Sequence, residues 1–127
     1  MKNFRDLTVW DKAHQLTLAT YRHTTGFPLE ERYGLISQIR HSAASIPANI
    51  AEGCGRRGNS EFHRFLTIAM GSASELEYHF LLAKDLDYVK PDVYESLNRA
   101  VVEIKRMFAA LLSRVDEERS RKQAAGQ

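Results

Sequence analysis

The side chains of this 127-residue chain that could do chemistry are five histidines, a lone cysteine and a pair of arginines. Glu75 and His79 are four residues apart, the spacing at which two side chains of one helix can share a metal ion. A metal centre inside a helical bundle needs a second such pair on another helix, and the sequence has none in register. Cys54 has no His placed to activate it, although the two arginines that follow would lower its pKa. These residues predict no catalytic centre, bound cofactor or metal.

Glycines and arginines gather in the segment Gly53–Gly58, GCGRRG. A phosphate-binding loop needs Lys and Ser or Thr in a fixed order between a strand and a helix, and that order is absent. The glycines are typical of a helix end followed by a turn. At the tip of this turn, Arg56 and Arg57 can either contact phosphates or remain solvated, and the sequence leaves both interpretations open.

The element that leads into this segment is a helix predicted from about Glu31 to Gly53. Apolar residues recur in it at steps of three and four, which places them on one face: Leu35, Ile39, Ala43, Ile46 and Ile50. A neighbouring row is polar and consists of Gln38, Ser42, Ser45, Asn49 and Glu52. Surface helices usually present Lys and Glu to water, so small hydrogen-bonding residues favour a packed face. We interpret Gln38, Ser42, Ser45 and Asn49, together with His41, as an interface between subunits, with a ligand surface as the alternative.

Three further helical segments follow from the same periodicity. The first extends from about Asp6, a candidate N-cap, to His23. The third extends from Asn59 or Ser60 to about Leu86. Pro91 suits the first turn of the fourth, whose apolar seam ends at Val115.

The connections between these four segments are short, which favours antiparallel neighbours. The residues after the fourth seam, DEERSRKQAAGQ, are polar throughout. We therefore expect an all-α, antiparallel up-down-up-down four-helix bundle over residues 1–115 and a disordered tail over residues 116–127.

Two finer predictions concern the third helix. The run Gly71–Ser74, GSAS, consists of small residues and favours close contact with another helix. Glu75 follows directly, and if it is buried it needs a basic partner, for which Arg40 is the candidate.

Composition narrows the class of protein. The chain has 18 basic and 16 acidic residues, a net charge of +2, so overall charge is weak evidence for a nucleic-acid partner. The basic excess lies in residues 1–60, which hold eight basic and five acidic groups. A single cysteine cannot form an internal disulfide, and no apolar run approaches the roughly 20 residues of a membrane span. A cytoplasmic location is the expectation.

Several blocks of the sequence resemble the four-helix bundle proteins associated with intervening sequences in bacterial 23S ribosomal RNA. The resemblance covers about residues 4–112. Its most distinctive block is SIPANIAEG at Ser45–Gly53, preceded by Ser37-Gln38-Ile39-Arg40 and followed by Phe62, Arg64-Phe65-Leu66 and Glu75-Leu76-Glu77.

This resemblance implies a left-handed bundle that assembles as a homopentamer around a central channel, with no established enzymatic activity. It also implies kinship with the accessory protein of diversity-generating retroelements, which binds nucleic acid and a reverse transcriptase through a basic surface. The family usually has a second basic residue after Arg40, whereas this chain has His41, which is mostly neutral near pH 7.

We therefore expect a non-catalytic oligomer that binds RNA or DNA, or that serves as an adaptor for a nucleic-acid enzyme. Its expected contacts are the basic residues of the first half: Lys2, Arg5, Arg40, Arg56 and Arg57. The alternative is a structural or protein-interaction scaffold on which these charges are only solvated.

Overall fold

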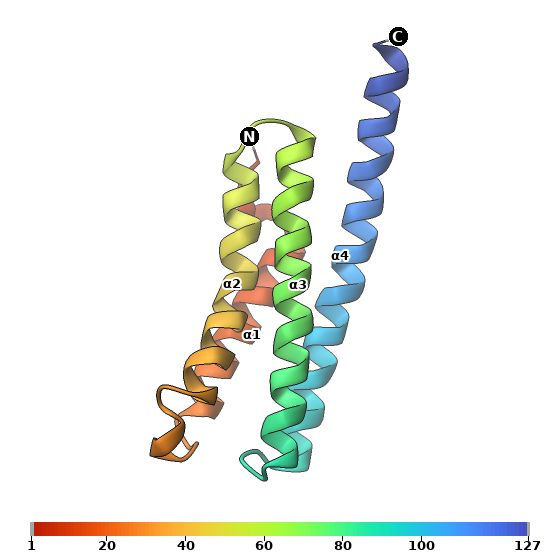
Figure 1. Ribbon diagram of the computed structural model, residues 1–127. Coiled ribbons are helices and arrows are strands. Elements are labelled where there is room, and N and C mark those ends of the chain that lie inside the picture. Colours follow the sequence, from red (N-terminus) through yellow and green to blue (C-terminus); the bar gives the residue numbers. More distant parts are fainter. Residues whose placement is uncertain (1, 127) are drawn as a thin grey trace.

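A computed structural model describes residues 2–126, which form four long helices joined by short connections (Figure 1). The helices are α1 (Thr8–Thr24), α2 (Leu35–Gly55), α3 (Gly58–Asp85) and α4 (Pro91–Ala125). Short 3-10 turns precede the first two helices, namely η1 (Phe4–Asp6) and η2 (Leu29–Glu31). Residues 2–126 contain no strand, so the predicted all-α fold is confirmed. None of the described helices is apolar over a length that would cross a membrane.

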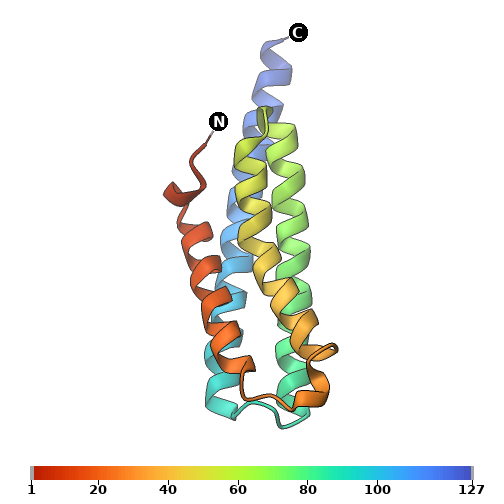
Figure 2. The same ribbon diagram turned by 90° about the vertical axis from the view of Figure 1, so that its left-hand side faces the viewer.

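The helices close into a bundle in chain order. Each packs against its neighbour in sequence, and α1 also packs against α4. The chain turns back at every connection, so consecutive helices point in opposite directions (Figures 1 and 2). The N-terminal segment and the α2–α3 connection consequently lie at one end of the bundle. The α1–α2 and α3–α4 connections lie at the other end.

The core is built from the apolar faces that the spacing predicts. In α2, Ile39, Ala43, Ile46 and Ile50 are each at most 1% exposed. They belong to one continuous cluster with buried residues of the other helices: Val9, Ala13, Leu16, Leu66, Ala69, Ala73, Leu76, Phe80, Val101, Ile104 and Phe108. Burying one large aliphatic or aromatic side chain contributes about 1.5–3 kcal/mol, so this cluster is what fixes the helices against each other.

Helix starts differ from the sequence predictions by a few residues. Asp6 is not the N-cap of α1, because it lies inside η1, which Asn3 caps by accepting from the Arg5 amide at 3.1 Å. Leu7 occupies the N-cap position instead and supplies no side-chain bond. The second helix begins at Leu35 because η2 and Gly34 intervene.

Two glycines explain the sharp passage from α2 to α3. A Cβ at Gly53 would lie 2.9 Å from the Cβ of Phe65, so only glycine lets the two helices approach this closely. Gly58 has φ of 81°, in the left-handed region that favours glycine, and it begins α3 slightly earlier than predicted.

Pro47 is buried within α2, and the helix continues beyond this proline to Gly55.

The C-terminal segment is helical, whereas the sequence predicts disorder from residue 116. Helix α4 continues to Ala125 and projects beyond the other helices (Figure 1), while Gln127 lies outside the described residues. The segment is rich in Glu, Arg, Lys, Gln and Ala, which have high helix propensity. Two contacts with α3 tie its beginning to the bundle: Asn59 donates to Glu118 at 3.0 Å, and His63 Nε2 lies 3.1 Å from Asp116.

Candidate nucleic-acid interface

Basic residues converge at the end of the bundle that carries the N-terminal segment and the α2–α3 connection. Lys2 and Arg56 line a hollow of about 240 Å³ together with Gly53, Cys54, Gly58, Asn59 and Phe62. Arg57 is exposed and occupies the N-cap position of α3. The structure thus brings together Lys2, Arg56 and Arg57, three of the five basic residues that the sequence predicts as contacts.

Lys2 is held against the α2–α3 connection although it lies near the chain terminus. Its backbone amide donates to the carbonyl of Cys54 at 3.3 Å. Its ammonium group lies 4.7 Å from the ring centroid of Phe62, a cation–π contact. Both contacts direct the lysine toward the hollow.

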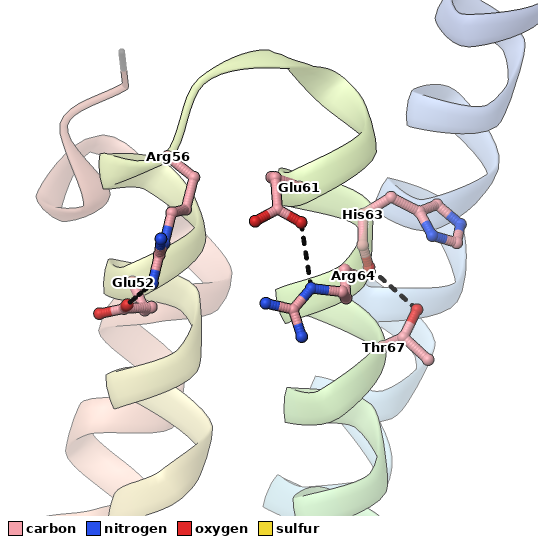
Figure 3. A network of polar contacts seen from close by, with 6 residues as sticks. All are labelled: Glu52, Arg56, Glu61, His63, Arg64 and Thr67. Atoms are coloured by element: carbon pink, nitrogen blue, oxygen red, sulfur yellow. Dashed lines mark hydrogen bonds and ion pairs between the residues drawn. The ribbon is translucent and has the colours of Figure 1, made fainter.

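Arg56 is held by one acidic and one aromatic neighbour. Its Nη2 donates to Glu52 Oε1 at 2.6 Å, and its guanidinium lies 5.2 Å from the Phe65 ring centroid. Arg64 repeats this arrangement on α3, where it donates to Glu61 at 3.0 Å (Figure 3). Its guanidinium lies 4.5 Å from the centroid of the same Phe65 ring. The two ion pairs are substantially exposed, so each contributes only about 0–1 kcal/mol to stability.

Acidic groups offset part of the positive charge at this end. Glu52 and Glu61 pair with arginines, and Asp116 and Glu118 approach α3 from the extension of α4. The surface is therefore mixed in sign, with its unpaired positive character concentrated at Lys2 and Arg57.

Neither of the remaining two predicted basic contacts lines this hollow. Arg5 belongs to η1, where its guanidinium lies 4.5 Å from the Phe4 ring. Arg40 faces the C-terminal part of α1: its Nε donates to Thr24 Oγ1 at 2.8 Å and its Nη2 to the Tyr21 carbonyl at 3.3 Å. Arg40 thus packs on α1, toward the opposite end of the bundle.

The predicted pairing of Arg40 with Glu75 does not occur. The reason is that α2 is flanked by α1 on one side and α3 on the other, and Arg40 projects toward α1. Glu75 is exposed on α3, and its nearest charged partner is the ring of His79, with Nε2 3.9 Å from its Oε1.

Two members of the polar row of α2, Ser42 and Ser45, contact α3 in the seam between the two helices. Ser42 Oγ lies 3.3 Å from His79 Nδ1, and Ser45 Oγ lies 2.8 Å from Ser72 Oγ. Asn49 turns back and donates to the Ser45 carbonyl at 2.8 Å. These hydroxyl groups therefore find partners within the chain.

Two members of the predicted subunit interface remain outside this seam. Gln38 and His41 are exposed on α2, as is Gly71 on α3. Of the predicted subunit interface, Gln38 and His41 are therefore the exposed members.

Ser42, His79 and Glu75 have the composition of a catalytic triad, but their geometry serves packing. Ser42 is 1% exposed and its hydroxyl donates to the Ile39 carbonyl at 3.1 Å, so a substrate cannot reach it. Burial lowers the pKa of His79 below its ordinary value, and Glu75 opposes that effect. The contact between Ser42 and His79 was not predicted from the sequence, although His79 falls on the buried stripe of α3 between Leu76 and Phe80. No three metal-binding side chains cluster within residues 2–126.

The sequence predicts a lowered pKa for the Cys54 thiol, and the structure gives a raised one. Cys54 is 2% exposed, and burial raises the pKa of its thiol while Lys2 partly opposes the shift. Desolvation outweighs the nearby positive charges, and the thiol is neutral near pH 7.

Comparison with known proteins places the chain in a family. Residues 5–110 match the profile of the 23S rRNA-intervening sequence protein family. The structure is similar to the crystal structure of a protein of unknown function from the S23 ribosomal protein family of Bacteroides thetaiotaomicron. The two share 27% sequence identity with a TM-score of 0.75, over 83% of this chain and 98% of that one. No curated protein matches the chain. The protein therefore belongs to the 23S rRNA-intervening sequence protein family.

Proposed function

We propose that this protein is a non-catalytic, oligomeric four-helix bundle that contacts RNA or DNA. The contact surface is the end of the bundle formed by the N-terminal segment and the α2–α3 connection, which we call the basic end: Lys2, Arg5, Arg56 and Arg57. The observation that carries this proposal is the convergence of Lys2 and Arg56 on one hollow from separate parts of the chain.

Phosphate contacts by Lys and Arg release counterions, so the proposed binding weakens steeply as salt increases. The mixed charge of the basic end makes the contact of one chain weak. Several copies in one oligomer strengthen it, because contacts after the first are intramolecular.

Fluorescence anisotropy with labelled single-stranded RNA and DNA tests this proposal at about 50 mM and 200 mM salt. We expect Arg56→Ala/Arg57→Ala to weaken binding at least tenfold. Arg99→Ala/Arg106→Ala removes two exposed arginines of α4 and serves as the matched control. Equal affinity of the two double variants, or no binding of the wild type at low salt, contradicts the proposal.

A second candidate is a structural or protein-interaction scaffold that does not bind nucleic acid. It is favoured by the ion pairs of Arg56 with Glu52 and of Arg64 with Glu61, which neutralise part of the positive charge at and beside the basic end. In that case oligomers form normally while nucleic acid does not bind.

A further inference from the structure

The hollow at the basic end has the size and lining of a site for one small anion. Its volume of about 240 Å³ is far larger than the space that a single water molecule needs, so a small anion can enter it. Lys2 and Arg56 supply its positive charge, of which the Glu52 carboxylate bonded to Arg56 offsets part, and no carboxylate belongs to its described lining. The charge and size together fit a phosphate group with part of its hydration shell.

Both cations are positioned before any ligand arrives. Phe62 holds the Lys2 ammonium and Phe65 holds the Arg56 guanidinium, and both rings belong to the buried face of α3. The bond from Arg56 to Glu52 involves one terminal nitrogen, and a guanidinium has five N–H donors, so donors remain for a ligand. Such preorganisation reduces the entropy that binding would otherwise cost.

The floor of the hollow is closed. Gly53, Cys54 and Phe62 are all buried and belong to its lining. A phosphodiester within a strand continues on both sides and needs an open groove, whereas a terminal phosphate has the chain on one side only. A terminal phosphate also carries about −1.5 to −2 charges at neutral pH, so the two cations attract it more strongly than they attract a singly charged diester.

Other groups around the hollow are compatible with an anion. Helix α3 begins at Gly58 on its rim, so the positive end of the helix dipole adds to the field of the two cations. The Cys54 thiol stays neutral because burial raises its pKa, so it adds no repelling charge.

We propose that this hollow binds a terminal phosphate monoester, in particular the phosphorylated end of a nucleic-acid strand. This assignment rests on the proposed nucleic-acid function and deepens it, because the basic end then recognises strand ends in addition to backbone. The same chemistry is present in a free nucleoside monophosphate, and the experiment separates the two sources.

The test compares two 12-nucleotide RNAs of one sequence, one with a 5′-phosphate and one with a 5′-hydroxyl, each labelled at the 3′ end. Adenosine monophosphate and adenosine form a parallel pair measured by calorimetry. The variants are Lys2→Ala and Arg56→Gln, and any affinity tag is placed at the C-terminus so that Lys2 stays unobstructed. Arg64→Gln is the matched control, since Arg64 pairs with a glutamate and contacts the Phe65 ring but lies outside the hollow. Circular dichroism verifies that each variant is folded.

We expect the phosphorylated RNA to bind at least tenfold more tightly than the hydroxyl form. Lys2→Ala and Arg56→Gln should each reduce that ratio to within twofold of unity, and Arg64→Gln should preserve it. A preference for adenosine monophosphate without strand binding supports the phosphate site, assigns it to free nucleotides and contradicts the proposed function.

Two results overturn the proposed site. One is equal affinity for the phosphorylated and unphosphorylated ligand, both for the two RNAs and for adenosine monophosphate and adenosine. If salt-dependent RNA binding persists in that case, the proposed function stands and only the phosphate site is wrong. The other is a loss in Arg64→Gln equal to that in Arg56→Gln, because it would show a diffuse charge effect.

Discussion

Gly53 connects the packing of the bundle to the basic end at the scale of a single residue. A Cβ there would lie 2.9 Å from Phe65 Cβ and 3.3 Å from Phe62 Cδ1, and these two rings hold Arg56 and Lys2. We predict that Gly53→Ala lowers the free energy of unfolding by about 1–3 kcal/mol through overpacking, measured by urea denaturation. Unchanged stability would show that α2 and α3 separate without cost at this point.

His79 gives the stability of the protein a defined pH dependence. Burial lowers its pKa in the folded state and Glu75 opposes the shift, so below neutral pH the unfolded chain binds the proton more readily. We predict that stability contributed by neutral His79 is present above its unfolded pKa, near 6.5, and is lost as pH falls through the lower folded value.

The measurement is the free energy of unfolding at pH 7.5 and at pH 5, for the wild type and His79→Gln. Other titrating groups are common to both proteins, so the comparison isolates His79. The wild type should lose more stability than the variant on acidification. An equal loss in both would contradict the prediction.

Gly71 of helix α3 has surroundings that differ completely from those of Gly53 in α2. Gly71 is exposed in the middle of the helix, and a Cβ built there would meet no atom within 4 Å. We predict that Gly71→Ala raises the free energy of unfolding by up to about 1 kcal/mol, because alanine has the higher helix propensity. Gly53→Ala is the control, because it is expected to lower the free energy of unfolding.

A loss of stability or of oligomer mass in Gly71→Ala would instead mean that another chain packs on this glycine. The run Gly71–Ser74 was predicted to allow close helix contact. Within the chain only part of it does so: Ser72 bonds to Ser45 and Ala73 is buried, while Gly71 and Ser74 are exposed.

Helix α4 is the element for which sequence and structure differ most. Its apolar seam ends at Val115, which led to the predicted tail, yet the helix continues for ten residues to Ala125. Helix propensity and side-chain contacts such as Arg119 with Asp116 at 3.6 Å support a helix that needs no apolar face.

The largest-scale property of the molecule is the number of chains in its oligomer. From the family resemblance we predict a homopentamer, with a mass by light scattering of five times the 14.5 kDa of one chain. Gln38 and His41 are the members of the predicted interface that remain exposed, so His41→Glu should lower that mass. Arg99→Glu on α4 is the control. A mass equal to one chain would refute the assembly and the multivalent binding that depends on it.

The four helices, their apolar faces and the family can be predicted from the sequence, because periodicity and the SIPANIAEG block are properties of the chain alone. It also located Pro91 at the start of α4 and the glycine-rich turn after α2. These features are set by residues within a few positions of each other, where helical spacing is sufficient information.

Which side chains of different helices contact each other depends on the tertiary structure and does not follow from the sequence. Arg40 bonds to Thr24 rather than to Glu75, Ser42 finds His79, and Lys2 joins Arg56 at one hollow. Each of these contacts joins different elements, and it depends on how the helices are rotated and staggered within the bundle. Spacing along one helix cannot determine that rotation, since it is set by how the buried side chains of all four helices fit together.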